Sequence, residues 1–260
     1  MDRPTSTPSE ILDYPNVKSY FEIVFKHVKA RIEKLYNDPI AVKNLEQSIE
    51  DDFLGTSRRP VAEIIKNPKE QFISDTLYRP FSEIISSYEA LRNIFIYIGL
   101  FPFKKQNVSR MSYLRYHIEG YLNEAYILRE RLLAYLKLID KGYKSTKSYP
   151  VIHKATTYLV SDVKKAFENL SKTRGSHVHK TRYSDRDLER LSLFETLSAG
   201  SDGELKQTVS ELYRVTYNQV RRKWRKSMAS NFEKIGKLLN AYFFLLQNSV
   251  CENSKLIIPK

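Results

Sequence analysis

The chain has little of what marks a secreted, zinc-binding or β-rich protein. Its 260 residues include one cysteine, Cys251, so an intramolecular disulfide and a cysteine-ligated zinc site are excluded. Only eight glycines and ten prolines are present, and no proline lies between Pro150 and Pro259. Such a stretch favours long helices, because proline breaks a helix interior. The cysteine usage leads us to expect a reducing, cytoplasmic location.

Long apolar runs are also lacking. The most apolar stretch, Ile94–Phe103, is too short to span a bilayer, and we expect it to be a buried helix end. The first fifteen residues are polar and proline-rich, without the apolar core of a signal peptide. No lipidation motif and no basic amphipathic terminus is present. We therefore expect no membrane association.

Positive charge is in excess. The 43 Lys and Arg residues outnumber 30 Asp and Glu residues, which gives a net charge of +13 and a pI near 9.5. A charge of this size attracts polyanions and speeds their capture, so nucleic acid is the leading partner. The alternative is that the charge serves solubility alone.

Apolar residues recur at steps of three and four, and no segment shows the alternation typical of strands. The sequence predicts an all-α protein, a multi-helix bundle of long antiparallel helices. We expect a flexible leader at 1–16, a single domain at 17–250 and a tail at 251–260. The expected helices are Val17–Tyr36, a shorter one after Pro39, about Gln71–Ile98 with a kink or interruption at Pro80, Ser109–Lys141, and Glu204–Gln247 with a bend near Ser227–Ser230 or Gly236.

The segment Lys172–Asp187, KTRGSHVHKTRYSDRD, is basic and has helix signals at both ends. A helical stripe follows Pro150, and Gly175 suits its C-terminal cap. Ser184 is placed as the N-cap of the next helix, with Asp187 completing an approximate capping box. The sequence therefore predicts a loop between Gly175 and Tyr183.

This loop is a candidate site. On a continuous helix, Arg174 and His179 would point about 140° apart, so they converge only if the chain turns between them, as Gly175 permits. The alternatives are plain helix capping with exposed histidines, and a metal site at His177 and His179. The metal site needs further ligands, for instance His153, which nothing in the sequence marks.

The residues RGSHVH (Arg174–His179) fit the Arg-x4-6-His motif of HEPN domains, the higher eukaryotes and prokaryotes nucleotide-binding superfamily. Together with the helix containing YLNEAYILRERLLAYL, they resemble one bacterial branch of that superfamily. The resemblance covers about Ser109–Gln247. It implies an all-α bundle and a homodimer that brings two Arg/His pairs into one basic cleft.

The resemblance further implies an endoribonuclease that needs no metal or other cofactor. Arg174 would stabilise negative charge on the phosphate, and His179 would act as general acid/base while the ribose 2′-OH attacks phosphorus. The expected ends are a 2′,3′-cyclic phosphate and a 5′-OH. Guanidinium matches phosphate geometry, and imidazole titrates near neutral pH, so both residue types suit these roles. Ser176 and His177 are secondary candidates, His177 because it would share a face with Arg174 if the helix persisted.

Further basic residues are candidates for RNA binding: Lys180 and Arg182 in the loop, and Arg221, Arg222 and Arg225 in the run RRKWRK. The alternative for that run is a solvated helix face. On the long helix, Arg115, Glu119, Arg129 and Arg131 either orient the histidine or form ion pairs along the helix.

Three hypotheses therefore stand. The first is a HEPN-type ribonuclease in a toxin or phage-defence role, with RNA as substrate and an antitoxin or other regulatory protein as a further partner. The second is a non-catalytic RNA- or nucleotide-binding HEPN module, favoured by Gly175 where many active members have Asn or Asp. The third is a helical protein-interaction domain.

Overall fold

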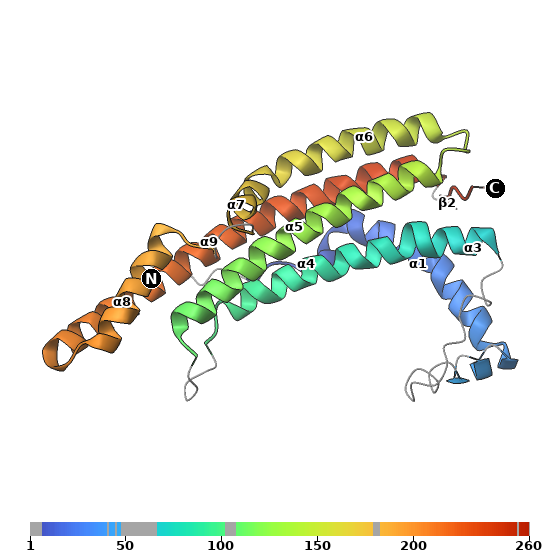
Figure 1. Cartoon of the computed structure of the whole chain (residues 1–260). Coiled ribbons are helices and arrows are strands. Elements are labelled where there is room, and N and C mark those ends of the chain that lie inside the picture. The colour runs from blue at the N-terminus through green and yellow to red at the C-terminus, as the bar shows by residue number, and fades with distance from the viewer. Residues whose placement is uncertain are drawn as a thin grey trace. The chain divides into compact units, whose positions relative to one another are not determined.

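The computed structural model shows a helical protein, which confirms the predicted all-α bundle (Figure 1). The structure describes residues 7–40, 42–44, 46–47, 67–101, 108–178, 183–253 and 255–259, with the backbone alone at 35 and at 174–178. The elements are the 3₁₀ turn Ile11–Asp13, α1 (Pro15–Tyr36), α3 (Pro68–Phe72), a π-helix (Ile73–Tyr78), α4 (Arg79–Tyr97), α5 (Arg110–Gly142), α6 (Tyr149–Ala166), α7 (Glu168–Val178), α8 (Arg186–Gly200), α9 (Gly203–Val250), β1 (Cys251–Glu252) and β2 (Lys255–Leu256).

The chain divides into two compact units, and the prediction of a single domain stays a prediction. One unit comprises Met1–Tyr14, Ile84–Leu132 and Ser161–Leu239; the other comprises Pro15–Glu83, Leu133–Val160 and Asn240–Lys260. We call them the first and the second unit. Each takes portions of α4, α5, α6 and α9.

The core of the first unit is centred on Phe232 of α9. Tyr88 and Phe95 of α4 and Tyr121 of α5 approach this ring, with centroids 5.7, 5.9 and 6.3 Å away. All four side chains are buried. Three helices are thus held together by aromatic side chains, each of which removes a large apolar area from water.

The core of the second unit is centred on Tyr20 of α1. Its ring lies 5.4 Å from Phe81 and 5.2 Å from Phe243, and its hydroxyl is 2.5 Å from that of Tyr135. Because both hydroxyls are buried, the hydrogen bond between them satisfies groups that have left water.

Pro80 interrupts the helical pattern, as its position in the sequence predicts. The interruption takes the form of a π-helix just ahead of it, in which the N–H of Arg79 donates to the carbonyl of Ser74, five residues back. In an α-helix the proline ring would clash with the carbonyl four residues earlier, that of Thr76. The wider turn keeps the chain helical up to the proline.

Part of the segment assigned to a flexible leader is bound to α4. Arg92 donates from Nε to the carbonyl of Pro8 at 3.0 Å, and the Tyr88 hydroxyl donates to the carbonyl of Ser9 at 3.0 Å. Ile11 is 2% exposed. At the other end, β1 and β2 pair as a short antiparallel hairpin, and Leu256 is buried.

Helix α9 is a single helix of 48 residues that continues through Ser227–Ser230 and Gly236, and the bend expected there stays a prediction. Gly236 has another role, since a Cβ there would lie 2.1 Å from the hydroxyl oxygen of Tyr14. The glycine therefore makes room for the Tyr14 side chain. Despite the length of α5 and α9, no helix formed by the described residues is apolar enough over a sufficient length to cross a membrane.

Candidate nucleic-acid interface

The motif arginine lies within a helix, and the prediction that Gly175 ends that helix is wrong. Helix α6 stops at Ala166, Phe167 stands between the two helices with its ring buried, and α7 then runs from Glu168 through Gly175 to Val178. Glycine weakens a helix interior by only about 1 kcal/mol, which neighbouring interactions can offset. One of these is the ion pair between Lys172 and Glu168.

This helix changes how the motif residues relate to one another. Positions 174 and 177 are three residues apart on a helical backbone, which puts them on one face. Arg174, Ser176 and His177 are described by backbone alone, while His179, Lys180, Thr181 and Arg182 lie outside the described residues. Any turn that brings Arg174 and His179 together must therefore come after Val178, because the chain does not turn at Gly175.

Tyr183 marks the other end of the motif segment, where the chain is bound to α5. Its backbone N–H donates to Oε1 of Glu119 at 3.1 Å, and its ring meets Trp224 of α9 edge-on at 5.6 Å. Its side chain is buried, and burial followed by the charge and hydrogen bond of Asp185 raises its pKa well above the ordinary value. This anchor places the end of the segment between α5 and α9.

The N-cap of α8 is Asp185, one residue beyond the predicted Ser184. The Asp185 Oδ1 accepts the backbone N–H of Leu188 at 2.9 Å and so satisfies one of the free donors of the first turn. Asp187 is paired instead with Lys223 of α9, and the hydrogen bond to this carboxylate raises the Lys223 pKa.

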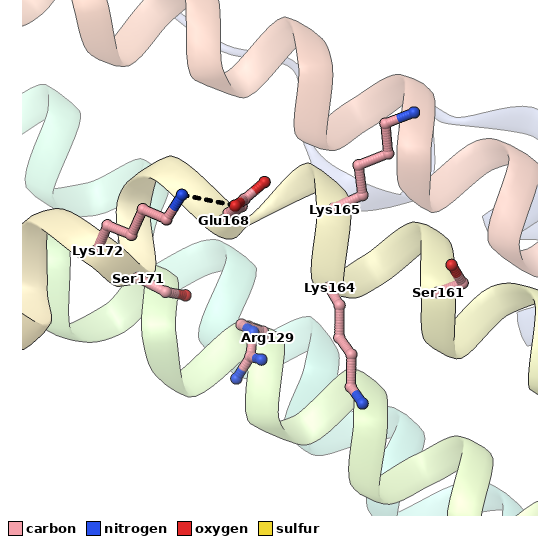
Figure 2. A pocket seen from close by; sticks show the side chains of 7 residues that line it. All are labelled: Arg129, Ser161, Lys164, Lys165, Glu168, Ser171 and Lys172. Atoms are coloured by element: carbon pink, nitrogen blue, oxygen red, sulfur yellow. Dashed lines mark hydrogen bonds and ion pairs between the residues drawn. The ribbon is translucent and has the colours of Figure 1, made fainter.

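A pocket lies beside the start of the motif segment, between α5, α6 and α7 (Figure 2). Its volume is about 570 Å³, which is ample for a small ligand. In Figure 2 the side chain of Lys164 extends toward α5, and Lys172 points back toward Glu168. The residues that line the pocket are Arg129, Ser161, Lys164, Lys165, Glu168, Ser171 and Lys172.

The pocket is strongly cationic. Four of its seven lining residues are Lys or Arg, and one is acidic. Lys172 Nζ lies 2.6 Å from Glu168 Oε1, and this hydrogen bond and charge lower the Glu168 pKa. Arg129 Nε and Ser171 Oγ are buried and have no hydrogen-bond partner among the described residues. Buried donors are normally satisfied, so two such groups without a partner at one pocket are a feature that a bound anion would account for.

The pocket and the contact between Tyr183 and Glu119 lie at the two ends of the motif segment, and both involve α5. Ser171 shares the pocket with Arg129, while Tyr183 is bonded to Glu119, ten residues earlier on the same helix. Ten helical residues correspond to roughly 15 Å along the axis. The segment that carries the motif thus starts and ends beside α5.

Sequence reasoning missed the pocket residues of α6 and α7. A signal was present, because Ser161, Lys164, Lys165, Glu168, Ser171 and Lys172 recur at steps of three and four and define one polar helical face. The pattern does not predict which helix completes the pocket, because Arg129 lies on a different helix more than thirty residues away in the sequence.

The three arginines of α9 that are candidates for RNA binding have different environments. Arg225 packs 5.1 Å from the Phe95 ring centroid, and burial, followed by the charge of Arg221, lowers its pKa. Arg221 donates to the carbonyl of Gly99 at 3.3 Å and lies over Tyr217. Of these three arginines, Arg222 is exposed whereas Arg221 and Arg225 are half-buried, so Arg222 is the one most accessible to a phosphate in solution.

The candidate residues on α5 also differ in their contacts. Glu119 binds Tyr183, as described, and Arg131 donates to the Ser87 hydroxyl of α4. Arg115, one turn before Glu119, is half-buried, and its Nε has no partner among the described residues. Arg129 forms an ion pair with the neighbouring Glu130 through its Nη1, and its buried Nε has no partner among the described residues.

The described residues provide no set of ligands for the metal site considered at His177 and His179. His153, the suggested additional ligand, has Nδ1 at 2.7 Å from Oδ1 of Asp140. Within the described part of the chain, no group of three or more His, Cys, Asp or Glu side chains is arranged to hold a metal ion.

No protein-family model matches the chain, and neither a curated protein nor a solved structure matches it.

Proposed function

We propose that this chain binds RNA along the surface of α6 and α7 and cleaves it, without metal, at a HEPN-type site formed by Arg174 and a histidine of the following segment. The observation that carries the proposal is the cationic pocket on α7, one helical turn ahead of Arg174. Phosphate groups are the ligands for which such a surface is suited.

In the proposed reaction, the histidine removes the proton from a ribose 2′-OH. The freed oxygen attacks the adjacent phosphorus and forms a 2′,3′-cyclic phosphate, while the 5′-oxygen leaves as an alcohol with a proton returned by the protonated base. Arg174 binds the non-bridging oxygens, where charge develops. Preorganised positive charge of this kind contributes about 10²–10³ in rate at comparable oxyanion sites.

His179 fits the family spacing, and His177 fits the local backbone. Because α7 is helical through Val178, positions 174 and 177 share a face without any further turn. His179 follows that helical end directly and requires the chain to turn there. Both histidines are therefore candidates for the general acid/base.

The second candidate function is RNA or nucleotide binding without cleavage. The continuous helix across Gly175 favours it, since no turn there brings Arg174 toward His179. A role as a helical protein-interaction domain is the remaining alternative, and it predicts no RNA binding even at low salt.

The test is incubation of the full chain with total RNA in EDTA, beside Arg174→Ala, His177→Ala and His179→Ala. We expect cleavage by the wild type, loss of cleavage in Arg174→Ala, and loss in only one of the two histidine variants. Circular dichroism of each variant checks that the fold is retained.

Each outcome decides between the candidates. Equal cleavage by the wild type and all three variants contradicts the catalytic assignment. RNA binding that weakens with salt, without cleavage, supports the binding module. Absence of RNA binding at low salt supports the interaction domain.

We further propose that the active form is a homodimer that brings two motif segments together, with a regulatory protein such as an antitoxin as partner. Sedimentation at micromolar protein concentration tests the first part. A dimer is expected, and a monomer that still cleaves RNA contradicts it.

A further inference from the structure

The cationic pocket between α5, α6 and α7 has the composition of an anion site. Lys164 and Lys165 form no ion pair with any residue that the structure describes, so their charges are not neutralised locally. Arg129 makes one contact through its Nη1, to the neighbouring Glu130, and its Nε remains a buried donor without a described partner. Ser171 adds a second buried donor from the opposite wall.

We propose that this pocket binds the phosphate group of a nucleotide, whether free or as one unit of an RNA strand. Guanidinium N–H groups and a hydroxyl are donors that phosphate oxygens accept, and lysine ammonium groups supply the balancing charge. The inference rests on the proposed RNA binding along α6 and α7 and names its phosphate subsite; it does not depend on the proposed cleavage, because it requires neither Arg174 nor a histidine.

The size and the lining indicate which part of the ligand is recognised. About 570 Å³ exceeds what a phosphate alone needs and admits a whole nucleotide. No aromatic side chain is among the described residues of the lining, so the pocket offers no platform on which a base would stack. The pocket therefore recognises phosphate without selecting the base.

Glu168 limits the affinity of the site. Its carboxylate holds the Lys172 ammonium at 2.6 Å, and a bound phosphate would lie close to the same negative charge. Replacing the carboxylate by an amide frees Lys172 and removes the repulsion. Glu168→Gln is thus expected to strengthen phosphate binding.

The probe is adenosine 5′-monophosphate, with adenosine as the ligand that lacks only the phosphate, titrated calorimetrically into the full chain at low salt. The pocket variants are Lys164→Gln, Arg129→Gln and Arg129→Lys. Loss of one charge-assisted hydrogen bond weakens binding by about tenfold or more. Arg129→Lys keeps the charge but loses the planar fork, so its binding should be intermediate, and thermal unfolding checks that each variant folds.

A matched control exists on α9, where Lys237 and Glu233 form an exposed pair with the same spacing and an Nζ–Oε1 distance of 2.7 Å. Lys237→Gln and Glu233→Gln change the net charge by the same amount away from the pocket. Lys237→Gln should weaken nucleotide binding by less than about twofold, since only long-range screened charge is lost.

The expected result is binding of the monophosphate but not of adenosine, weakened in the pocket variants and strengthened in Glu168→Gln. Parallel loss of single-stranded RNA binding identifies an RNA phosphate as the ligand; unchanged RNA binding identifies a free nucleotide. Equal binding of both probes, no binding of either, or equal weakening in Lys164→Gln and Lys237→Gln overturns the proposal. Loss in Arg174→Ala alone also overturns it, whereas retention there keeps the pocket distinct from the proposed catalytic site.

Discussion

Gly236 of α9 and Tyr14 at the N-terminal end of the first unit fit against each other closely. The Tyr14 hydroxyl is 3.2 Å from that of Tyr88, so the ring is fixed on one side by a hydrogen bond and on the other by the glycine. Helical periodicity predicts α9 but assigns Gly236 only a possible bend. The approach of Tyr14 is a long-range contact, which local sequence patterns do not carry.

Gly236→Ala should destabilise the first unit. The new Cβ would lie 2.1 Å from the Tyr14 hydroxyl and 2.3 Å from its ring, so Tyr14 must move. Overpacking costs about 1–3 kcal/mol, which outweighs the gain of up to about 1 kcal/mol in helix propensity. Urea unfolding of both proteins measures the difference.

Gly200→Ala is the control for this substitution. Gly200 is the last residue of α8, and nothing lies within 4 Å of a Cβ there, so its free energy of unfolding should be unchanged or slightly higher. A Gly236→Ala protein at least as stable as the wild type would contradict the account of this contact.

At the scale of elements, the sequence predicts helix positions well and their ends less well. The periodicity of apolar residues locates α1, α5 and α9 almost to their termini, because burial of one face is a property of the whole helix. Ends depend on single residues whose preferences are small. Gly175 has a local preference for ending a helix, yet α7 continues to Val178, and the break comes instead at Phe167, whose ring is buried.

The N-cap of α8 provides a test at this scale. Asp185→Ala removes the acceptor of the Leu188 N–H and of the Tyr183 hydroxyl, so it should lower the free energy of unfolding by about 1 kcal/mol. Ser184→Ala should have little effect, since its hydroxyl is exposed and makes only a 3.5 Å contact with Glu189. Thermal and urea unfolding compare the two. Equal destabilisation by the two substitutions, or a larger effect of Ser184→Ala, would contradict the assignment of Asp185 as the N-cap.

At the scale of the whole molecule, composition and patterning were enough to predict an all-α protein, and the charge predicts a nucleic-acid partner, which stays a prediction. Scarce proline and glycine, absent strand alternation and a charge of +13 are properties of the chain that need no three-dimensional arrangement. The pocket could not be predicted in the same way. It forms only where Arg129 of α5 meets the lysine-bearing face of α6 and α7, and no local pattern pairs those helices.

The many tyrosines give the molecule a predictable response to alkaline pH. Burial raises the pKa of Tyr20, Tyr135 and Tyr242 well above the ordinary value of about 10. These groups keep their protons in the folded chain while the unfolded chain loses them, so stability is complete below pH 10 and falls above it. Each costs about 1.4 kcal/mol by pH 11, or roughly 4 kcal/mol for the three.

Absorbance at 295 nm and circular dichroism, followed together from pH 9 to 12, check this expectation. Tyrosinate should appear in two phases, the later one coinciding with loss of helix. Titration of all eighteen tyrosines near pH 10, with the helix signal intact, would contradict the burial of these side chains.

The central claim is that Arg174 takes part in metal-free RNA cleavage by 2′-OH attack. The most direct measurement is mass spectrometry of the ends formed from a defined single-stranded RNA in EDTA, with and without a 2′-deoxy substitution at the cleaved position. The account predicts a 2′,3′-cyclic phosphate and a 5′-OH with the wild type, and no product with Arg174→Ala or with the 2′-deoxy RNA. RNA left intact by the wild type, or cleaved equally by Arg174→Ala, would contradict it.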